Sequence, residues 1–234
     1  VVIMKKIAIL QSNYIPWKGY FDLVNSVDVF VLYDDMQYTR RDWRNRNKVK
    51  GPGGLKWLSI PVEVKGKYLQ RINETRISDS SWAANHWQTL RGFYARAPHF
   101  RDYADALEAL YQQAGTLELL SEVNHLFITS INRWLGITTT IQWSSDYQLV
   151  DGKSERLLGI CKDAEATHYL SGPAAKDYLA AELFTASGIE VDWMDYSGYP
   201  EYPQGHGDFE HGVTVLDLLF HCGSDAPAMM KSFA

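Results

Sequence analysis

Two short apolar segments joined by a helical pattern limit the folds open to this chain. Residues 6–11 form an apolar run bounded by polar side chains, which is typical of a buried strand. Pro16 presets the backbone for the first turn of a helix, and apolar side chains recur at near-helical spacing over residues 20–27. A second apolar run covers residues 28–33. Strand, helix and strand within about 30 residues form a βαβ unit, which predicts a parallel sheet.

The rest of the chain also contains both strands and helices. We predict strands at residues 55–64, 138–143, 167–171 and 189–194, and helices at 82–97, 101–114, 117–135, 153–164, 174–187 and 213–221. Ser80 or Ser81 is the expected N-cap of the first of these helices, and Gly136 the glycine just past the third. We therefore expect residues 1–234 to form a single α/β domain, a Rossmann-like parallel sheet with a helical insert at about 80–136.

Composition and charge exclude several classes of protein. The net charge of −5 differs from the basic balance of general nucleic-acid-binding proteins, so we expect no nucleic-acid partner. No apolar run is long enough to span a bilayer, and Lys5 and Lys6 interrupt any signal-like segment, which predicts a cytoplasmic location. Two cysteines exclude a disulfide framework. His206, His211 and His221 lack the spacing of metal ligands, so we predict no metal site.

The turn after the first predicted strand is the first candidate site. Its candidate ligand contacts are Gln11, Asn13, Tyr14, Trp17, Lys18, Gly19 and Tyr20. In a parallel sheet, ligands bind beyond the carboxyl ends of strands and close to helix N-termini. Lys18 would add a positive charge there, and Gly19 would let the backbone approach an anion. The alternative is a plain connection whose aromatic side chains pack locally.

A basic and aromatic segment, residues 34–50, is the second candidate site. Six cations fall within residues 40–50 of an acidic chain, which creates a local positive field. The candidate contacts are Gln37, Arg40, Arg41, Trp43, Asn45, Arg46 and Lys48. Arginine binds phosphate in a bidentate manner, and Trp43 or Tyr38 could stack on a base or a sugar. A solvated charged loop and a site for single-stranded RNA are the alternatives, although the acidic remainder favours a compact anion.

The third candidate site combines two predicted helix starts. Lys153 and Arg156 begin one helix, and Ser171 and Gly172 follow a strand. Both places would lie near helix N-termini and could meet phosphate or carboxylate. The alternative for the two cations is surface pairing with nearby carboxylates. His86 could act as a general base near neutral pH, or it could be a core histidine.

Several segments resemble the WbqC-like family in order along nearly the whole chain. They are Ala8–Phe21, Asp34–Arg46, Trp57–Pro61, Tyr169–Ala175 and Val215–Phe220. In the first segment Ser12 replaces a proline that is usual in the family, which should matter little to Gln11. The resemblance implies a role in bacterial surface-polysaccharide biosynthesis, such as O-antigen or capsule, where the family modifies sugars.

The first turn also resembles that of HIGH-motif nucleotidylyltransferases, in which a His-x-Gly-His-like element follows the first strand. Here Trp17-Lys-Gly-Tyr20 occupies that place with both histidines missing. The resemblance implies a HIGH-type fold, whereas transfer of adenylyl or cytidylyl groups by the usual route would lack its imidazoles.

Together these observations predict a transferase that acts on a nucleotide-linked amino sugar. Arg40, Arg41, Arg46 and Lys48 would neutralise phosphate, while Gln11, Tyr14, Lys18, Gly19 and Tyr20 line the reacting pocket. Asp34 or His86 would accept the proton of the attacking amine, and Lys18 and Tyr20 complete the catalytic set. An acyl or aminoacyl donor is the co-substrate, and a homo-oligomer is compatible with the sequence. The alternatives are nucleotidylyl transfer or ATP-dependent ligation, and a non-catalytic module that binds a sugar nucleotide or a partner protein.

Overall fold

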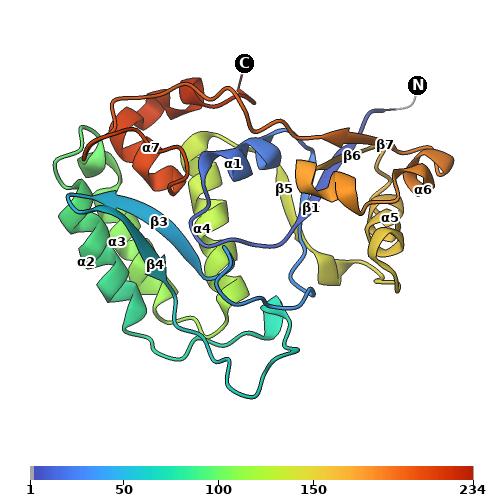
Figure 1. The fold of residues 1–234 in the computed structure, drawn as a ribbon, viewed down its shortest axis with the longest axis horizontal. Helices are drawn as coiled ribbons and strands as arrows, with labels where there is room; N and C mark the ends of the chain where they lie inside the picture. Colours follow the sequence, from blue (N-terminus) through green and yellow to red (C-terminus); the bar gives the residue numbers. More distant parts are fainter. Residues whose placement is uncertain (1–2, 234) are drawn as a thin grey trace.

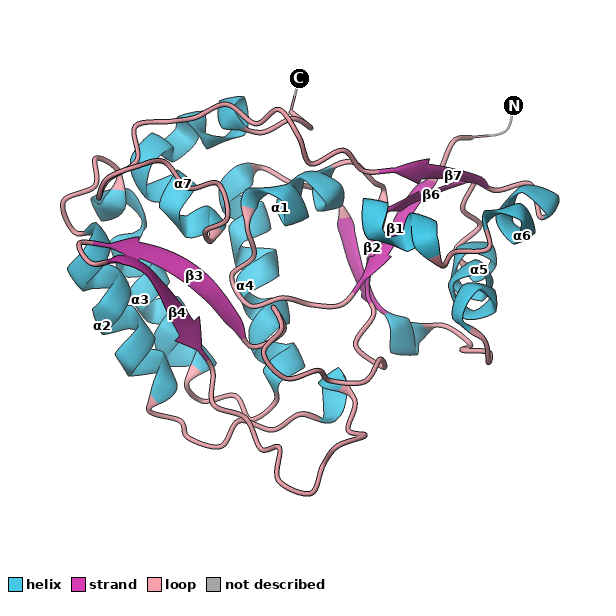
Figure 2. Cartoon of the chain, in the orientation of Figure 1, coloured by secondary structure: helices cyan, strands magenta, loops and turns pink. Residues whose placement is uncertain are grey.

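A computed structural model describes residues 3–233 and shows a mixed α/β fold. A five-stranded sheet lies on one side of the molecule, and a two-stranded hairpin with two long helices lies on the other (Figure 1). A long loop leads from the sheet at β7 back to α7 on the hairpin side (Figure 2). The predicted α/β class, a parallel sheet with helices, is confirmed.

The five-stranded sheet is parallel throughout. Its strands are β1 (Lys6–Leu10), β2 (Val29–Leu32), β5 (Thr140–Trp143), β6 (His168–Ser171) and β7 (Glu190–Trp193). They lie in the order β5-β2-β1-β6-β7, with Ile7 of β1 in register with Val29 and Tyr169 of its two neighbours. From β1 the chain adds β2 and then β5 on one side of the sheet. It then returns to add β6 and β7 on the other side of β1. The reversal between β1 and β6 is the topological switch point, where open α/β sheets bind ligands.

Helices cover both faces of the sheet. The helices of the described residues are α1 (Lys18–Asn25), α2 (Trp82–Tyr94), α3 (Phe100–Ala114), α4 (Leu120–Leu135), α5 (Lys153–Asp163), α6 (Ala181–Ala186) and α7 (Val215–Cys222), with the 3-10 turns η1 (Ile72–Glu74), η2 (Ser144–Asp146), η3 (Pro173–Asp177) and η4 (Gly223–Met229). Of these, α2 and α3 pack on the hairpin side. As predicted, Gly136 follows α4, in the left-handed conformation with φ of 75°. Among the described residues, no helix is long and apolar enough to cross a membrane.

The alternation of side chains along β2 divides the core into two clusters. Val29 and Val31 join a cluster with α5 and α6, whereas Phe30 and Leu32 join the larger cluster with α1, α4 and α7. Successive residues of a strand point to opposite faces, so one short strand supplies both. Phe30 and Leu32 are both fully buried. Each contributes about 2–3 kcal/mol by leaving water.

The basic segment forms a strand that its sequence does not reveal. Strand β3 (Arg46–Gly51) pairs antiparallel with β4 (Gly54–Ser59), and Lys48 lies opposite Trp57. The alternative of a solvated charged loop is wrong for residues 46–51, and the strand predicted at 55–64 ends at Ser59. Gly54 closes the turn with φ of 98°, a conformation that favours glycine.

Two helix predictions also need correction. The helix expected at 174–187 is divided into η3 and α6, because the N–H of Ala180 leaves the helical pattern and donates to Ser154 Oγ at 3.0 Å. Ser81 is the N-cap residue of α2, but its side chain makes no cap hydrogen bond. Instead, Asp79 Oδ1 accepts from the Ser81 N–H at 2.9 Å.

Candidate functional site

A cavity of about 560 Å³ lies at the switch point between β1 and β6. This volume is within the range of small-molecule sites, and the position is the one that open α/β sheets use for ligands. Its lining residues are Ile9, Leu10, Gln11, Leu23, Tyr33, Met36, Gly152, Lys153, Arg156, Leu157, Tyr169, Leu170, Ser171, Gly172, Ala174, Ala175 and Tyr178. Most of these are apolar, so the few polar side chains would fix the orientation of a ligand.

Residues from two separate candidate regions meet in this cavity. Gln11 follows β1 directly, and Ser171 ends β6 in the neighbouring position of the sheet. Lys153 begins α5, after Gly152 with φ of 95°. The partial positive charge of the α5 N-terminus is therefore close to the exposed ammonium group of Lys153. Gly172 completes the group.

Arg156 is held at the cavity wall by a buried carboxylate. Its Nη1 donates to Asp35 Oδ2 at 3.0 Å, and its Nε donates to the carbonyl of Val150 at 2.8 Å. Among the described residues, the second oxygen of Asp35 has no hydrogen-bond partner although it is buried. Tyr33 also lines the cavity, and burial raises its pKa to about 12. Sequence reasoning missed Tyr33 and Asp35, although Tyr33 is the last residue of the second predicted strand and Asp35 follows it closely.

Asp34, predicted as a proton acceptor, lies in a closed network. Its Oδ1 accepts from the N–H of Ser12 at 2.8 Å, and its Oδ2 accepts from the hydroxyls of Ser12 and Ser121, each at 2.6 Å. Asn124 Nδ2 donates to the same Ser12 hydroxyl at 2.9 Å. Burial raises the pKa of Asp34 despite these hydrogen bonds. The network ties the β1–α1 loop to α4 and lies outside the cavity lining.

His86, the other predicted proton acceptor, lies in a buried aromatic cluster. Its Nε2 donates to the carbonyl of Ser59 at 3.1 Å, so its Nδ1 accepts from the hydroxyl of Tyr14 at 2.8 Å. Tyr111 lies 2.6 Å from the same hydroxyl. Burial lowers the pKa of His86 to about 4, which keeps the ring neutral at pH 7. Tyr14 is fully buried and does not line the cavity.

Lys18 and its neighbours pack under the loop that precedes α7. The Lys18 ammonium group donates to His211 Nδ1 at 2.6 Å and lies 5.0 Å from the ring centre of Tyr199. Burial lowers the pKa of Lys18 to about 8. Trp17 packs on the backbone of Gly19 and lies 5.4 Å from Tyr196.

Tyr20 connects α1 to the end of β1. Its hydroxyl donates to the carbonyl of Gln11 at 3.0 Å. Asn13 accepts from the guanidinium of Arg44, which fixes the loop that follows Gln11. These contacts place Lys18, Tyr20 and Asn13 in the support of the loop, with Gln11 alone of the first candidate region among the cavity-lining residues.

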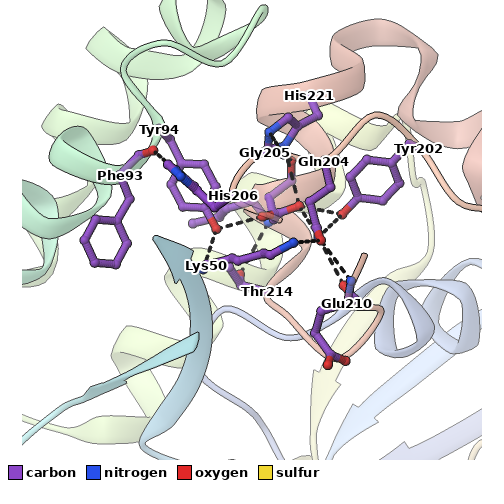
Figure 3. Close-up of polar contacts among 12 residues, drawn as sticks. Lys50, Phe93, Tyr94, Tyr202, Gln204, Gly205, His206, Glu210, Thr214 and His221 are labelled. Carbon is purple, nitrogen blue, oxygen red and sulfur yellow. Dashed lines mark hydrogen bonds and ion pairs between the residues drawn. The ribbon is translucent and has the colours of Figure 1, made fainter. Parts of the chain in front are cut away.

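A second closed network lies between α7 and β3 (Figure 3). Gln204 accepts from the ammonium group of Lys50 at 2.9 Å and donates to the buried carboxylate of Asp217 at 2.8 Å. The same carboxylate accepts from the hydroxyls of Tyr94 and Tyr202 at 2.8 and 2.6 Å. Burial alone would raise the pKa of Asp217, but hydrogen bonds from His221, Tyr202 and Gln204 lower it. This network fastens the 204–210 loop to the hairpin.

The candidate contacts of the basic segment, from Gln37 to Lys48, are exposed or half-buried and lie outside the cavity lining, which Met36 of this segment does join. Trp43 and Trp57 are both 39% exposed, with ring centres 5.3 Å apart. The guanidinium of Arg46 lies 3.9 Å from the ring centre of Trp57, and Lys48 lies 5.0 Å from it. Arg40 and Arg41 are exposed. Gln37 donates to the carbonyl of Tyr68 at 2.8 Å, and Asn45 donates to that of Ile60 at 2.9 Å.

Residues 3–233 contain no group of three or more histidine, cysteine and acidic side chains arranged to hold a metal ion. The predicted roles of the individual site residues stay predictions. Their positions in the structure separate them into two groups. Gln11, Lys153, Arg156, Ser171 and Gly172 meet in one cavity, whereas the others support loops or cover the surface.

Comparison with known proteins agrees with the resemblance of the five segments. The chain is 49% identical over 230 residues to the uncharacterized protein Rv1507c of Mycobacterium tuberculosis, covering 97% of this chain and 98% of the relative. The WbqC-like protein family matches residues 11–229. This match includes Gln11, the end of β6 and the whole basic segment. The chain therefore belongs to the WbqC-like family.

Proposed function

We propose that the protein binds a nucleotide-linked amino sugar in the switch-point cavity and transfers an acyl or aminoacyl group to the sugar amine. The observation that carries the proposal is the convergence of Gln11, Ser171 and two cations on one cavity at the reversal of strand order. Folds of this topology bind nucleotides at that place. The resemblance to the family implies that the sugar belongs to a surface polysaccharide.

The phosphates are assigned to the α5 side of the cavity. Lys153 presents an ammonium group beside the α5 N-terminus. Arg156 presents the guanidinium donors that do not bond to Asp35 or Val150, with the exposed carboxylate of Asp151 3.9 Å from Nη2. A helix N-terminus and two cations together favour a diphosphate. Arg40 and Arg41 lie outside the cavity lining, so this assignment replaces the one that the sequence suggested.

The sugar is assigned to the sheet-end residues Gln11 and Ser171, which offer hydrogen bonds. In the transfer step the amine nitrogen attacks the carbonyl carbon of an activated ester or thioester. A new C–N amide bond forms, the C–O or C–S bond of the donor breaks, and the leaving group departs with its electron pair. The proton of the amine leaves with that group or passes to water. Such an attack needs no covalent intermediate on the protein.

Binding is tested first, by calorimetry with a nucleoside-diphosphate amino sugar. The expected result is that Lys153→Met weakens binding about tenfold, whereas Lys162→Met, at the opposite end of the same helix, has no effect. Arg40→Ala/Arg41→Ala also leaves the affinity unchanged. If the Arg40/Arg41 variant lost binding and Lys153→Met did not, the phosphate would lie on the basic segment and the proposal would be wrong.

The reaction is tested next, by mass spectrometry of the sugar after incubation with acyl and aminoacyl donors. An increase in mass equal to one acyl group supports the transferase. Release of pyrophosphate from ATP or CTP would instead support nucleotidylyl transfer in a HIGH-type fold. Tight binding without product for any donor would identify a sugar-nucleotide-binding module.

A further inference from the structure

The charge of this acidic protein is strongly segregated along the chain. Residues 40–70 contain nine basic and two acidic side chains, a net charge of +7. The remaining residues contain 14 basic and 26 acidic side chains, a net charge of −12. In the described residues, Arg40, Arg41, Arg46 and Lys48 make no ion pair, while Arg44 pairs with Asp42 and Lys67 with Glu63. Lys50 is buried. The segment therefore presents largely unneutralised positive charge to the solvent.

The same segment holds most of the exposed apolar side chains in the described part of the chain. Nine large hydrophobic residues are exposed, and five of them lie within residues 40–70. They are Trp43, Leu55, Trp57, Tyr68 and Leu69, with Leu69 82% exposed and Tyr68 73% exposed. Tyr68 and Leu69 follow Lys65 and Lys67 in the loop after β4, at the lower edge of Figure 1. Apolar side chains gathered in this way mark an interaction surface.

Contacts join these residues into one surface. The guanidinium of Arg40 lies 5.8 Å from the ring centre of Tyr68, which links the loop to the start of the basic segment. Arg46 donates to the carbonyl of Arg41 and stacks on Trp57. Trp57 in turn contacts Trp43, and Leu55 lies two residues before Trp57 on the same face of β4. We call this set the basic-aromatic surface.

We propose that the basic-aromatic surface docks the protein on an anionic lipid bilayer, as a peripheral contact. The positive charge fits a negatively charged membrane surface, and tryptophan and tyrosine favour the headgroup region. A lipid bilayer offers both the negative charge and hydrocarbon for the exposed side chains of Leu55 and Leu69. A nucleic acid or an acidic glycan would engage the cations and rings but offers nothing to these leucines. The proposal is independent of the ligand in the switch-point cavity.

The test is vesicle flotation of the full chain. Vesicles of phosphatidylcholine alone are compared with vesicles that also contain phosphatidylglycerol. The protein should float with the anionic vesicles only, and the bound fraction should fall with added salt, since the screening length shrinks from about 10 Å at 0.1 M to about 3 Å at 1 M. Arg41→Gln/Lys65→Gln should weaken binding about 30-fold, because each cation near the surface contributes about fivefold.

The apolar contribution is tested separately. Tyr68→Ser/Leu69→Ser should weaken binding about tenfold at constant charge. The matched control is Arg101→Gln/Lys162→Gln, two exposed cations outside the surface, which should have no effect. Equal flotation with both vesicle types, or none with either, would overturn the proposal. So would unchanged vesicle binding by the Tyr68/Leu69 variant together with tight, salt-sensitive binding of an oligonucleotide or heparin, which would assign the surface to a soluble polyanion.

Discussion

Asp34 and Asp35 are neighbours in the sequence, but they belong to opposite sides of the sheet. Asp34 continues the face of Leu32, where both of its oxygens accept hydrogen bonds from Ser12 and Ser121. Asp35 continues the face of Tyr33, where one oxygen accepts from Arg156 and the other has no partner among the described residues. On the Asp34 side, which we call the closed side, the protein itself supplies the hydrogen-bonding partners. On the Asp35 side, which we call the open side, Arg156 lines the cavity.

This difference separates structural polar groups from groups available to a ligand. A buried carboxylate whose oxygens are all paired stabilises the fold, and a substrate could reach it only by breaking those bonds. The same description fits His86 and Asp217, whose polar atoms also bond within the protein. A buried oxygen without a partner carries a desolvation cost that a ligand or a solvent molecule can relieve. We therefore expect ligand chemistry on the α5 side.

The largest expected effect comes from breaking the closed side. Asp34→Ala removes the acceptor of three hydrogen bonds and leaves the buried N–H of Ser12 unpaired. We expect a loss of about 4 kcal/mol in the free energy of unfolding, measured by urea denaturation.

Asp34→Asn distinguishes a structural role from a catalytic one. It keeps the shape and one acceptor oxygen, so it should cost about half as much as Asp34→Ala. The fraction of the Asp34→Asn variant that is folded should still bind the sugar nucleotide. Loss of transfer at unchanged stability and affinity would instead identify Asp34 as the proton acceptor.

The pH dependence of stability is the next test of the closed side. Burial lowers the pKa of His86 to about 4, whereas the unfolded value is about 6.5. The unfolded chain therefore binds the proton more tightly, and the contribution of neutral His86 is complete above pH 6.5 and lost as pH falls towards 4. We expect this contribution to reach about 3 kcal/mol. The difference in unfolding free energy between the wild type and His86→Gln, followed from pH 4 to 7, isolates it. A constant difference would mean that His86 is exposed to solvent in the folded protein.

Arg156 tests the open side. Arg156→Met removes the only hydrogen-bonding partner of the Asp35 carboxylate in the described residues, so we expect a loss of about 2 kcal/mol in stability. Adding Asp35→Asn to Arg156→Met should recover part of that loss, because the unpaired buried charge is then removed. Urea denaturation of both single variants and the double variant gives the coupling energy. Additive effects would contradict the pairing.

The fold was predictable where the hydrophobic pattern is local. Residues 6–33 show one strand, a helix and a second strand in the sequence itself, and the structure confirms them. Strand β3 was hidden because Arg46, Lys48 and Lys50 alternate with Asn47 and Val49, a pattern that lacks an apolar face of its own. Its partner strand supplies the packing through Trp57 and Leu58. The break between η3 and α6 depends on Ser154, a residue about 25 positions earlier, which no local pattern contains.

The site was predictable only in part, for a similar reason. Both the end of the first strand and the start of the helix at Lys153 were recognised as ligand-binding positions. Nothing local showed that they share one cavity, because the order β2-β1-β6 arises from long-range pairing. The choice of Asp34 over Asp35 likewise required knowing which face of β2 the cavity adjoins. The alternation of side chains along a strand shows which residues share a face of the sheet. It does not show which of the two faces adjoins a cavity.

Substitution of Lys153 is expected to have the smallest effect on the stability of the protein and a clear effect on its affinity for the ligand. This side chain is exposed and makes no hydrogen bond or ion pair within the described residues, so Lys153→Met should leave the unfolding free energy unchanged. Its effect on a bound diphosphate should be about tenfold in affinity, and it should diminish with salt because the cation is screened. Arg156→Met should weaken binding as well, but with a loss of stability that Lys153→Met lacks. Calorimetric titrations of both variants at low and high salt therefore separate charge supplied to a ligand from charge required by the fold. Equal affinities for the wild type and Lys153→Met at low salt would remove the α5 N-terminus from the site and leave only the sheet-end residues to bind the ligand.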